Sequence, residues 1–332
     1  MDFASILSDL KKKKYQPVYF LMGEEPYFID VISDYVEKNI LDESEREFNQ
    51  TVLYGRDTDV GTIASEAKRY PMMAEHQVVI VKEAQNVRNI EDLEPYLQNP
   101  LTSTILVLCY KYKTLDKRKT FAKTVAKRGV LFESERLREY KIPDWINGYL
   151  KEKNYTVGPK ASQLLTEYLG NDLGKITNEL DKLMINLPPG TEITPDHIQD
   201  NIGISKDYNT FELNDALTKR DVVKANRIVN YFAANSKDHP MPVTIAALYS
   251  YFSKVLVYHF LQDKSKDAAA RALGVHPFFV QDYQKAASAY PAGKLKLIFS
   301  YLREYDLRSK GFENASAGDG ELMKELVYKI LH

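Results

Sequence analysis

The feature that most constrains the fold is an alternation of short β-rich runs with helical segments between residues 18 and 133. Such alternation is typical of parallel strands joined by helical crossovers that cover both faces of a sheet. Apolar residues recur at helical spacing in 27–41, and 63–70 and 115–128 are shorter helical segments. The expected strands are VYFLM (18–22), FNQTVLY (48–54), QVVIV (77–81), TILVLC (104–109) and VLFE (130–133).

The pattern changes near residue 141, and the remainder is predicted to be helical. Two helices joined at residues 170–172, followed by a short helix with Thr194 as its N-cap, predict a small helical domain. From about residue 208 long helical segments follow one another, which suits a helical bundle. We therefore predict the fold class α/β plus all-α, divided into a parallel-sheet domain, a small helical domain and a C-terminal helical bundle at residues 1–140, 141–207 and 208–332.

Composition excludes some functions. The 332 residues carry a formal net charge of −1, so tight independent binding to DNA through phosphate neutralisation is not expected, and any DNA contact is shared with partners. The single cysteine, Cys109, lies in an apolar run and fits a reducing cytoplasm. No apolar stretch has signal-peptide character or approaches the roughly 20 residues of a spanning helix. We expect a cytoplasmic, unexported protein that has no contact with a membrane.

The strand 18–22 and the turn after it have the outline of a phosphate-binding element without its chemistry. A P-loop needs glycines whose N–H groups cradle phosphates, a lysine for the β- and γ-phosphates, and a hydroxyl for Mg²⁺. After this strand the chain offers Gly23, then Glu24 and Glu25, with no lysine, serine or threonine up to Asp30. The two glutamates would repel a polyphosphate. We expect no nucleotide here.

Two further segments have similar defects. A Walker B strand ends in an acidic residue that helps to hold Mg²⁺, but after 77–81 that position is Lys82, and Glu83 has no metal to serve. The run GNDLGKITNEL (170–180) resembles the second-sensor helix of AAA+ ATPases, with Gly174 in place of the arginine that reaches the γ-phosphate. Each segment alone also suits an ordinary strand or helix. Their order and joint spacing favour a nucleotide-free AAA+-like module with no catalytic residues and no cofactor.

Other reactive groups are scattered. The histidines show no metal-ligand spacing, so no metal site is expected, and Cys109 on a buried strand does not suit a nucleophile. An active P-loop enzyme with an unusual site remains an alternative. The six histidines are His76, His197, His239, His259, His276 and His332.

Four segments together resemble the delta-subunit family of bacterial DNA polymerase III clamp loaders, over essentially the whole chain. The resemblance implies an AAA+-like domain, a helical lid domain and a collar domain for oligomerisation in a five-subunit loader. It also implies a non-catalytic, DNA-replication subunit of the DNA polymerase III holoenzyme. Such a subunit binds the beta sliding clamp and opens its ring for loading onto primed DNA, together with gamma/tau and delta-prime subunits. The segments are PVYFLMGEEPYFID (17–30), AKRYPMMAEHQVVIVKEAQ (67–85), GNDLGKITNELDKL (170–183) and ALGVHPFFVQDYQKAASAY (272–290).

The resemblance places the clamp contact just before the Walker B-like strand, at Tyr70, Pro71, Met72 and Met73. The family usually has two large apolar residues, often Leu-Phe, where this chain has the methionines. Methionine is unbranched and polarizable, and it can fill an irregular pocket, while proline would stiffen the approach. From pattern alone, the two methionines could also begin the buried strand 77–81.

Phe312, in the polar loop 309–321, is a candidate DNA contact because an exposed aromatic ring can stack on an unpaired base. It could equally fold back onto the preceding helix.

A second reading is a scaffold, such as a delta-prime-like stator subunit of the loader or another AAA+-like interaction protein. A delta-prime-like chain is expected to carry a zinc-binding cysteine cluster and a Ser-Arg-Cys arginine finger. Neither occurs in this sequence, which has one cysteine.

Overall fold

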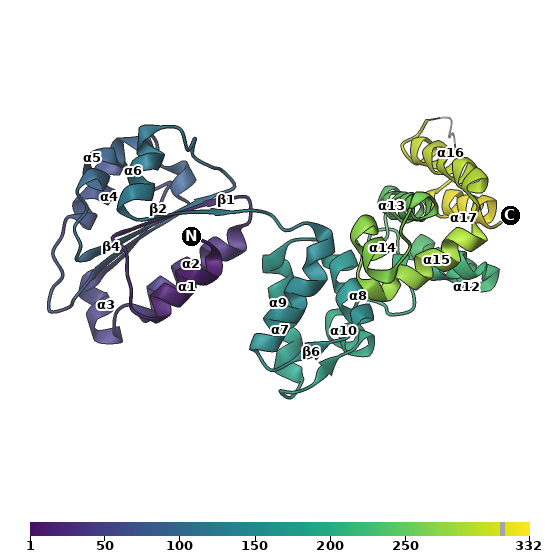
Figure 1. The fold of residues 1–332 in the computed structure, drawn as a ribbon, viewed down its shortest axis with the longest axis horizontal. Coiled ribbons are helices and arrows are strands. Elements are labelled where there is room, and N and C mark those ends of the chain that lie inside the picture. The colour runs from purple at the N-terminus through teal and green to yellow at the C-terminus, as the bar shows by residue number, and fades with distance from the viewer. Residues whose placement is uncertain (313–315) are drawn as a thin grey trace. The chain divides into compact units, whose positions relative to one another are not determined.

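The computed structural model of the protein describes residues 1–312 and 316–332, and the chain divides into two compact units, Met1–Leu137 and Arg138–His332 (Figure 1). The strands of the first unit form one sheet in which each neighbouring pair is parallel. This confirms the predicted parallel sheet. The strands are β1 (Val18–Gly23), β2 (Gln50–Tyr54), β3 (Gln77–Lys82), β4 (Thr104–Lys111) and β5 (Val130–Ser134), in the order β2-β3-β4-β1-β5.

Helices cover both faces of this sheet, as the alternating pattern predicts (Figure 1). The helices of the first unit are α1 (Phe3–Lys11), α2 (Pro26–Asn39), α3 (Glu43–Asn49), α4 (Val60–Ala67), α5 (Glu94–Gln98) and α6 (Thr120–Arg128), with the short 3-10 helices η1 (Ala84–Asn86) and η2 (Ile90–Leu93). α1 and α2 lie on one face, and α4, α5 and α6 lie on the other.

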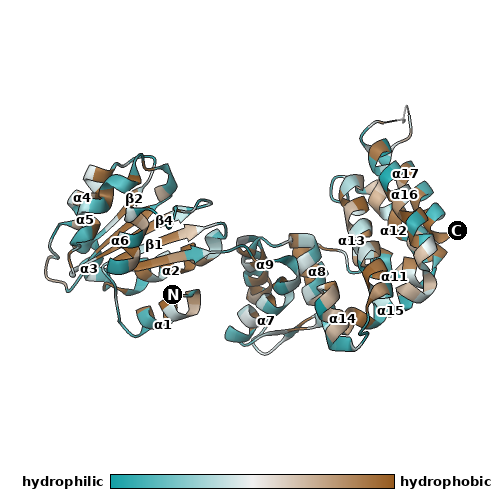
Figure 2. Ribbon diagram, turned by 45° about the horizontal axis from the view of Figure 1, so that its top comes forward, coloured by the Kyte–Doolittle hydropathy of each residue, from teal (hydrophilic) through white to brown (hydrophobic). Residues whose placement is uncertain are grey.

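The side chains of β1 alternate between two apolar cores. Tyr19 and Leu21 pack with residues of α1 and α2, whereas Phe20 and Met22 pack with residues of α4, α5 and α6. Burial on both faces explains why these strands read as unbroken apolar runs rather than as alternating ones. The apolar colour accordingly follows the strands in Figure 2.

The elements of the first unit differ from prediction at several ends. The expected strand 48–54 begins only at Gln50, because the preceding residues belong to α3, a helix that the pattern did not predict. Asp42 and Glu45 form a capping box that starts α3. The expected helix 115–128 begins only at Thr120.

The first part of the second unit is mainly helical, with one difference from expectation. The short strands β6 (Thr156–Val157) and β7 (Glu192–Ile193) form a parallel pair in a region predicted to be wholly helical. Their β-branched residues suit strands better than helices, but two residues are too few to give a sequence pattern. Thr194 caps the last helix, as predicted, by accepting the His197 amide. The helices are η3 (Glu139–Lys141), α7 (Ile142–Glu152), α8 (Pro159–Leu169), α9 (Leu173–Asn186) and α10 (Pro195–Ile202).

The second part of this unit is helical throughout the described residues from Thr210 onward. One apolar core joins its helices, with Phe252 and Tyr290 among the largest fully buried side chains. The Tyr290 hydroxyl donates to the Leu217 carbonyl at 2.7 Å, so this buried polar group is satisfied. The helices are α11 (Thr210–Lys219), α12 (Val222–Ala234), α13 (Met241–Phe260), α14 (Lys266–Leu273), η4 (Pro277–Phe279), α15 (Val280–Ala289), α16 (Ala292–Ser309) and α17 (Asp319–Leu331).

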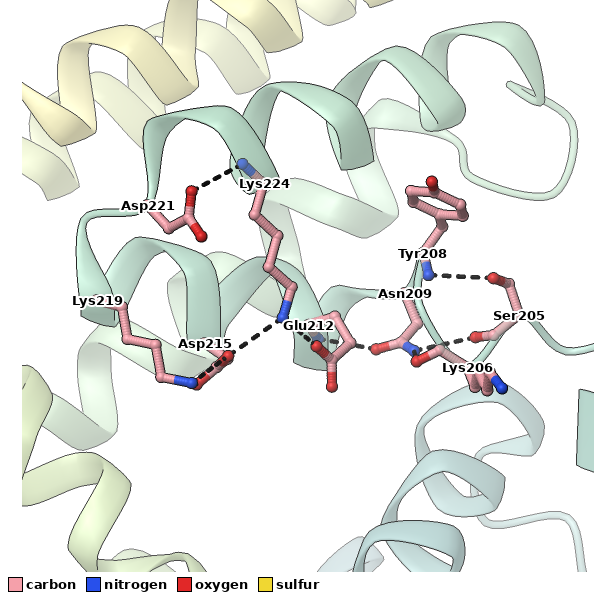
Figure 3. A network of polar contacts seen from close by, with 9 residues as sticks. All are labelled: Ser205, Lys206, Tyr208, Asn209, Glu212, Asp215, Lys219, Asp221 and Lys224. Atoms are coloured by element: carbon pink, nitrogen blue, oxygen red, sulfur yellow. Dashed lines mark hydrogen bonds and ion pairs between the residues drawn. The ribbon is translucent and has the colours of Figure 1, made fainter. Parts of the chain in front are cut away.

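A polar network marks the start of this helical part (Figure 3). Asn209 caps α11 by accepting the Glu212 amide at 2.9 Å, and its own amide donates to the Ser205 and Lys206 carbonyls at 3.0 and 3.1 Å. One turn farther on, the Lys224 ammonium of α12 contacts Glu212 and lies 3.3 Å from an Asp215 oxygen, both on α11. The network therefore joins the first two helices to each other and to the segment before them.

We expect Asn209→Ala to lower the free energy of unfolding by about 1 kcal/mol, because α11 loses its N-cap and two carbonyls lose a donor. Denaturant titration measures the change. Asn226→Ala is the matched control, since this exposed side chain bonds only to the Val222 carbonyl within its own helix. Equal losses for the two variants would contradict the assignment of Asn209 as a stabilising cap.

Candidate functional site

The turn between β1 and α2 lies where a P-loop would bind phosphate, although the sequence lacks the P-loop residues there. Gly23 has φ +128°, and a Cβ atom there would lie 2.1 Å from the Ser134 carbonyl oxygen. The glycine is therefore required by close packing against β5, which is a reason independent of any phosphate.

Glu25 lies where a phosphate would approach the N-terminus of α2. Its side chain is buried, 3% exposed, and its carboxylate accepts the Tyr27 amide at 3.1 Å. A helix N-terminus attracts anions through its free N–H groups and its dipole. In this chain a carboxylate of the protein itself occupies that position.

The residue in the Walker B position is also engaged within the protein. The Lys82 ammonium lies 2.7 Å from a Glu37 carboxylate oxygen on α2. Partial burial acts to lower the pKa of Lys82, but the hydrogen bond and charge of Glu37 outweigh it and raise that pKa above its usual value. A lysine held cationic beside a carboxylate would oppose Mg²⁺.

A similar ion pair closes the end of β4, where the Lys111 ammonium lies 2.6 Å from an Asp30 oxygen of α2. Glu83, after β3, lies 3.7 Å from the Arg56 guanidinium. The charges at the carboxyl ends of β3 and β4 are thus balanced by neighbouring side chains.

The helix with the sensor-like sequence is α9. Asp172 caps it by accepting the Lys175 amide at 3.0 Å. A Cβ atom on Gly174 would meet nothing closer than 3.5 Å, so packing does not require glycine there. The local packing would therefore accept a side chain at position 174, so the absence of the arginine is a difference of sequence that the fold does not impose.

The residues proposed from sequence as a binding element, Tyr70, Pro71, Met72 and Met73, lie together in the loop between α4 and β3. We call them the methionine element. The side chains of Tyr70, Met72 and Met73 are 76%, 59% and 100% exposed. The buried strand begins only at Gln77, so the alternative in which the methionines start the core strand is wrong.

This exposed loop is held to the body of the first unit at defined points. The Ala67 carbonyl, at the end of α4, accepts the hydroxyls of Tyr96 and Thr104 at 3.2 and 2.9 Å. Farther along, the side chain of Asn49 bonds to both the N–H and the carbonyl of Met72. Sequence reasoning missed Asn49, since no local pattern links it to a residue 23 positions away.

The candidate DNA contact, Phe312, follows α16 and is 66% exposed. Its backbone N–H donates to the Leu307 carbonyl, 3.0 Å away. The backbone of Phe312 therefore caps the preceding helix, as the alternative to a DNA contact expects, while its ring remains largely exposed. Residues 313–315 of this loop lie outside the described residues.

Other candidate chemistry is limited in the part of the chain that the structure describes. Cys109 is fully enclosed in β4, where burial raises the pKa of its thiol to about 12, so the reactive thiolate is disfavoured. Among residues 1–312 and 316–332, no group of three or more His, Cys, Asp or Glu side chains could hold a metal ion. Within the same ranges no helix combines the length and apolarity needed to cross a bilayer.

The parallel sheet with helices on both faces, the altered nucleotide elements at its edge and the helical C-terminal region define an AAA+-like α/β protein. Within this class, the chain belongs to the DNA polymerase III delta subunit family. The family model for the delta subunit matches residues 19–135, and the model for its C-terminal domain matches residues 207–325. Together the two models cover more than half of the chain, and a solved structure that it resembles is that of a DNA clamp loader delta protein.

Two sequence relatives and one solved structure match most of this chain. DNA polymerase III subunit delta of Bacillus subtilis (strain 168) is 27% identical, covering 97% of this chain and 94% of its own. A probable DNA polymerase III subunit delta of Aquifex aeolicus (strain VF5) is 26% identical, covering 88% and 86%. The solved structure of the Bacillus subtilis DNA clamp loader delta protein covers 99% of each chain with a TM-score of 0.54 and 24% identity, and it supports the fold.

We expect Glu25→Ala to lower the free energy of unfolding by about 1 kcal/mol, because α2 loses the carboxylate at its N-terminus. The variant will not gain ATP binding, since the lysine and hydroxyl of a P-loop are still missing. Denaturant titration and titration with a fluorescent ATP analogue measure the two effects. Glu24→Ala, at the exposed neighbouring position, is the control; binding of ATP by the unaltered chain would favour the active P-loop enzyme instead.

Proposed function

We propose that this chain is the clamp-opening subunit of its loader. It binds the beta sliding clamp through the methionine element and opens the ring for loading onto primed DNA, without hydrolysing ATP. The observation that carries the proposal is the exposure of Met72 and Met73 on a loop that is anchored to the sheet domain. Two adjacent large apolar side chains held in solvent suit insertion into an apolar pocket of a partner.

The chemistry of the methionines suits an anchor. Full burial of two such side chains contributes roughly 3–6 kcal/mol, and ordering each of them costs about 0.5–1.5 kcal/mol. Methionine fills irregular pockets because its chain is unbranched and polarizable, so it can replace the leucine and phenylalanine common in the family. The methionine element thus anchors the contact, and the other contacting residues add shape complementarity to the clamp.

Ring opening requires only differential binding. A ligand that binds an open ring better than a closed one shifts the population toward the open form. Moving an equilibrium from 1:99 to 99:1 needs a difference of about 5.5 kcal/mol between the binding free energies for the open and the closed ring. Burial of Met72 and Met73 contributes to this difference only where the open ring accepts them better than the closed ring does.

The altered nucleotide elements support a subunit without ATPase activity. Glu25 occupies the helix terminus where phosphate would bind, and Lys82 is paired with Glu37. In the proposal, ATP acts through neighbouring motor subunits of the gamma/tau type. The chain assembles with these and with a delta-prime subunit in the cytoplasm.

The helical second unit fits the assembly role. Its residues from 208 onward have an apolar core of their own, which supports a collar domain (208–332) that holds the loader together. Residues 141–207 then act as the lid domain, and residues 1–140 as the AAA+-like domain. A delta-prime-like stator is the alternative, but the single cysteine provides no zinc-binding cluster for it.

We expect the Met72→Ala/Met73→Ala variant to bind the beta clamp of its own organism about 100-fold or more weakly than the unaltered chain, because most of the buried apolar surface is lost. Calorimetry with the isolated chain measures this affinity. Met72→Leu/Met73→Phe retains apolar bulk and should bind well. Ile185→Ala, which truncates an exposed apolar side chain of the second unit, is a control that should change nothing.

If the unaltered chain does not bind the clamp, the proposal is wrong, and a scaffold subunit becomes the favoured function. Equal binding by the double alanine variant would instead show that the contact lies elsewhere. In both cases circular dichroism establishes that the variants are folded.

We propose Phe312 as a contact to an unpaired base near the primer-template junction, supported by its exposed ring. Loss of one base–aromatic stack weakens binding by about fivefold or more, so Phe312→Ala should lower the affinity of the assembled loader for primed DNA by that factor. Fluorescence anisotropy measures it. Phe260→Ala, which removes another exposed ring of the same unit, is the control, and equal affinity for the two variants would exclude the contact.

A further inference from the structure

Asn49, the last residue of α3, makes a paired contact with Met72. The Met72 N–H donates to Asn49 Oδ1 at 2.6 Å, and Asn49 Nδ2 donates to the Met72 carbonyl at 2.9 Å. The same Nδ2 donates to the Glu45 carbonyl at 3.0 Å, one turn back in α3. The side chain therefore bonds to Met72 as an opposite residue does in a hydrogen-bonded pair of antiparallel strands.

Burial makes this contact selective for asparagine. Asn49 is 1% exposed, so water cannot replace a lost partner. An amide supplies the acceptor and the donor that the Met72 backbone requires, whereas an aspartate carboxylate would face the Met72 carbonyl oxygen and repel it. Asn39, at the end of α2, has no such role, since its side chain bonds to the Tyr35 carbonyl of its own helix.

The contact fixes the loop at its middle. Between the end of α4 at Ala67 and the start of β3 at Gln77 the chain is irregular, and Met72 lies halfway along it. The next residue, Met73, has φ +54°, a left-handed conformation that is unfavourable for a side chain with a Cβ atom. Such a conformation persists only where the surrounding structure holds the chain, and Asn49 bonds to the backbone of the residue immediately before it.

We infer that Asn49 is the positioning residue of the clamp contact: it holds the Met72 backbone so that Met72 and Met73 are presented before the partner arrives. This inference rests on the proposed function. A preformed loop binds without first being ordered, so its competent fraction is close to one. Without the two hydrogen bonds from Asn49 to Met72, the loop is divided between conformations that present the methionines and conformations that do not.

A positioning residue and a contact residue are expected to affect different rate constants of clamp binding. If the presenting fraction falls, the association rate falls in proportion while the bound complex dissociates at its former rate. Removal of a contact, as in Met73→Ala, instead acts mainly on the dissociation rate. Both rates can be measured by stopped-flow fluorescence or surface plasmon resonance with the full chain and the beta clamp. These measurements therefore distinguish a positioning residue from a contact residue.

We expect Asn49→Ala to lower the association rate about tenfold, with a dissociation rate within about twofold of the unaltered chain. Amide hydrogen exchange on the free chain provides a readout without the clamp, and exchange at Met72 should accelerate about tenfold or more. Asn39→Ala, which removes an equivalent bond inside α2, should change neither quantity. If Asn49→Ala does not fold, Asn49→Asp takes its place in both measurements. Aspartate keeps the shape of the side chain and its acceptor oxygen but lacks the amide donor.

An unchanged association rate and unchanged Met72 exchange in a folded variant would overturn the role of Asn49 while leaving the clamp contact intact. A rise in dissociation rate alone would also overturn it, because that would make Asn49 part of the contact itself. Failure of the unaltered chain to bind the clamp has a different meaning, since it removes the proposed function as well.

Discussion

The first unit depends on one constraint, the burial of a parallel sheet on both faces. Parallel strands need crossover connections, and the helices of those crossovers cover the sheet, so the middle of each central strand is apolar. The carboxyl ends of the strands then meet at one edge, which is where ligands bind in open α/β sheets. In this chain Gly23, Lys82 and Lys111 occupy that edge.

That edge is closed by the protein itself. A carboxylate caps α2 where phosphate would bind, and the lysines that end β3 and β4 are paired with Glu37 and Asp30 of the same helix. The charges of both lysines are thus balanced within the protein, and the two ion pairs fasten α2 to the sheet. The contacts that hold this edge together come from side chains of the protein itself.

The proposed clamp contact lies at the opposite edge of the sheet. The methionine element precedes β3, whereas Lys82 ends it, and a strand of this length separates the two by about 20 Å. A rigid sheet lies between the altered nucleotide edge and the exposed methionines. The loop in turn gains its definition from bonds at Ala67 and Met72 to other parts of the same unit.

The sequence by itself determined the strands of the sheet, the missing phosphate-binding residues and the family, because these depend on short apolar runs and on local motifs. It could not predict α3, α5 or the β6–β7 pair, whose few residues carry no clear periodicity. It left open whether Met72 and Met73 were buried in a strand or exposed in a loop. Only the tertiary structure decided this, because the hydrogen bonds that place Met72 come from Asn49, distant in the chain, and local patterns contain no information about such pairing.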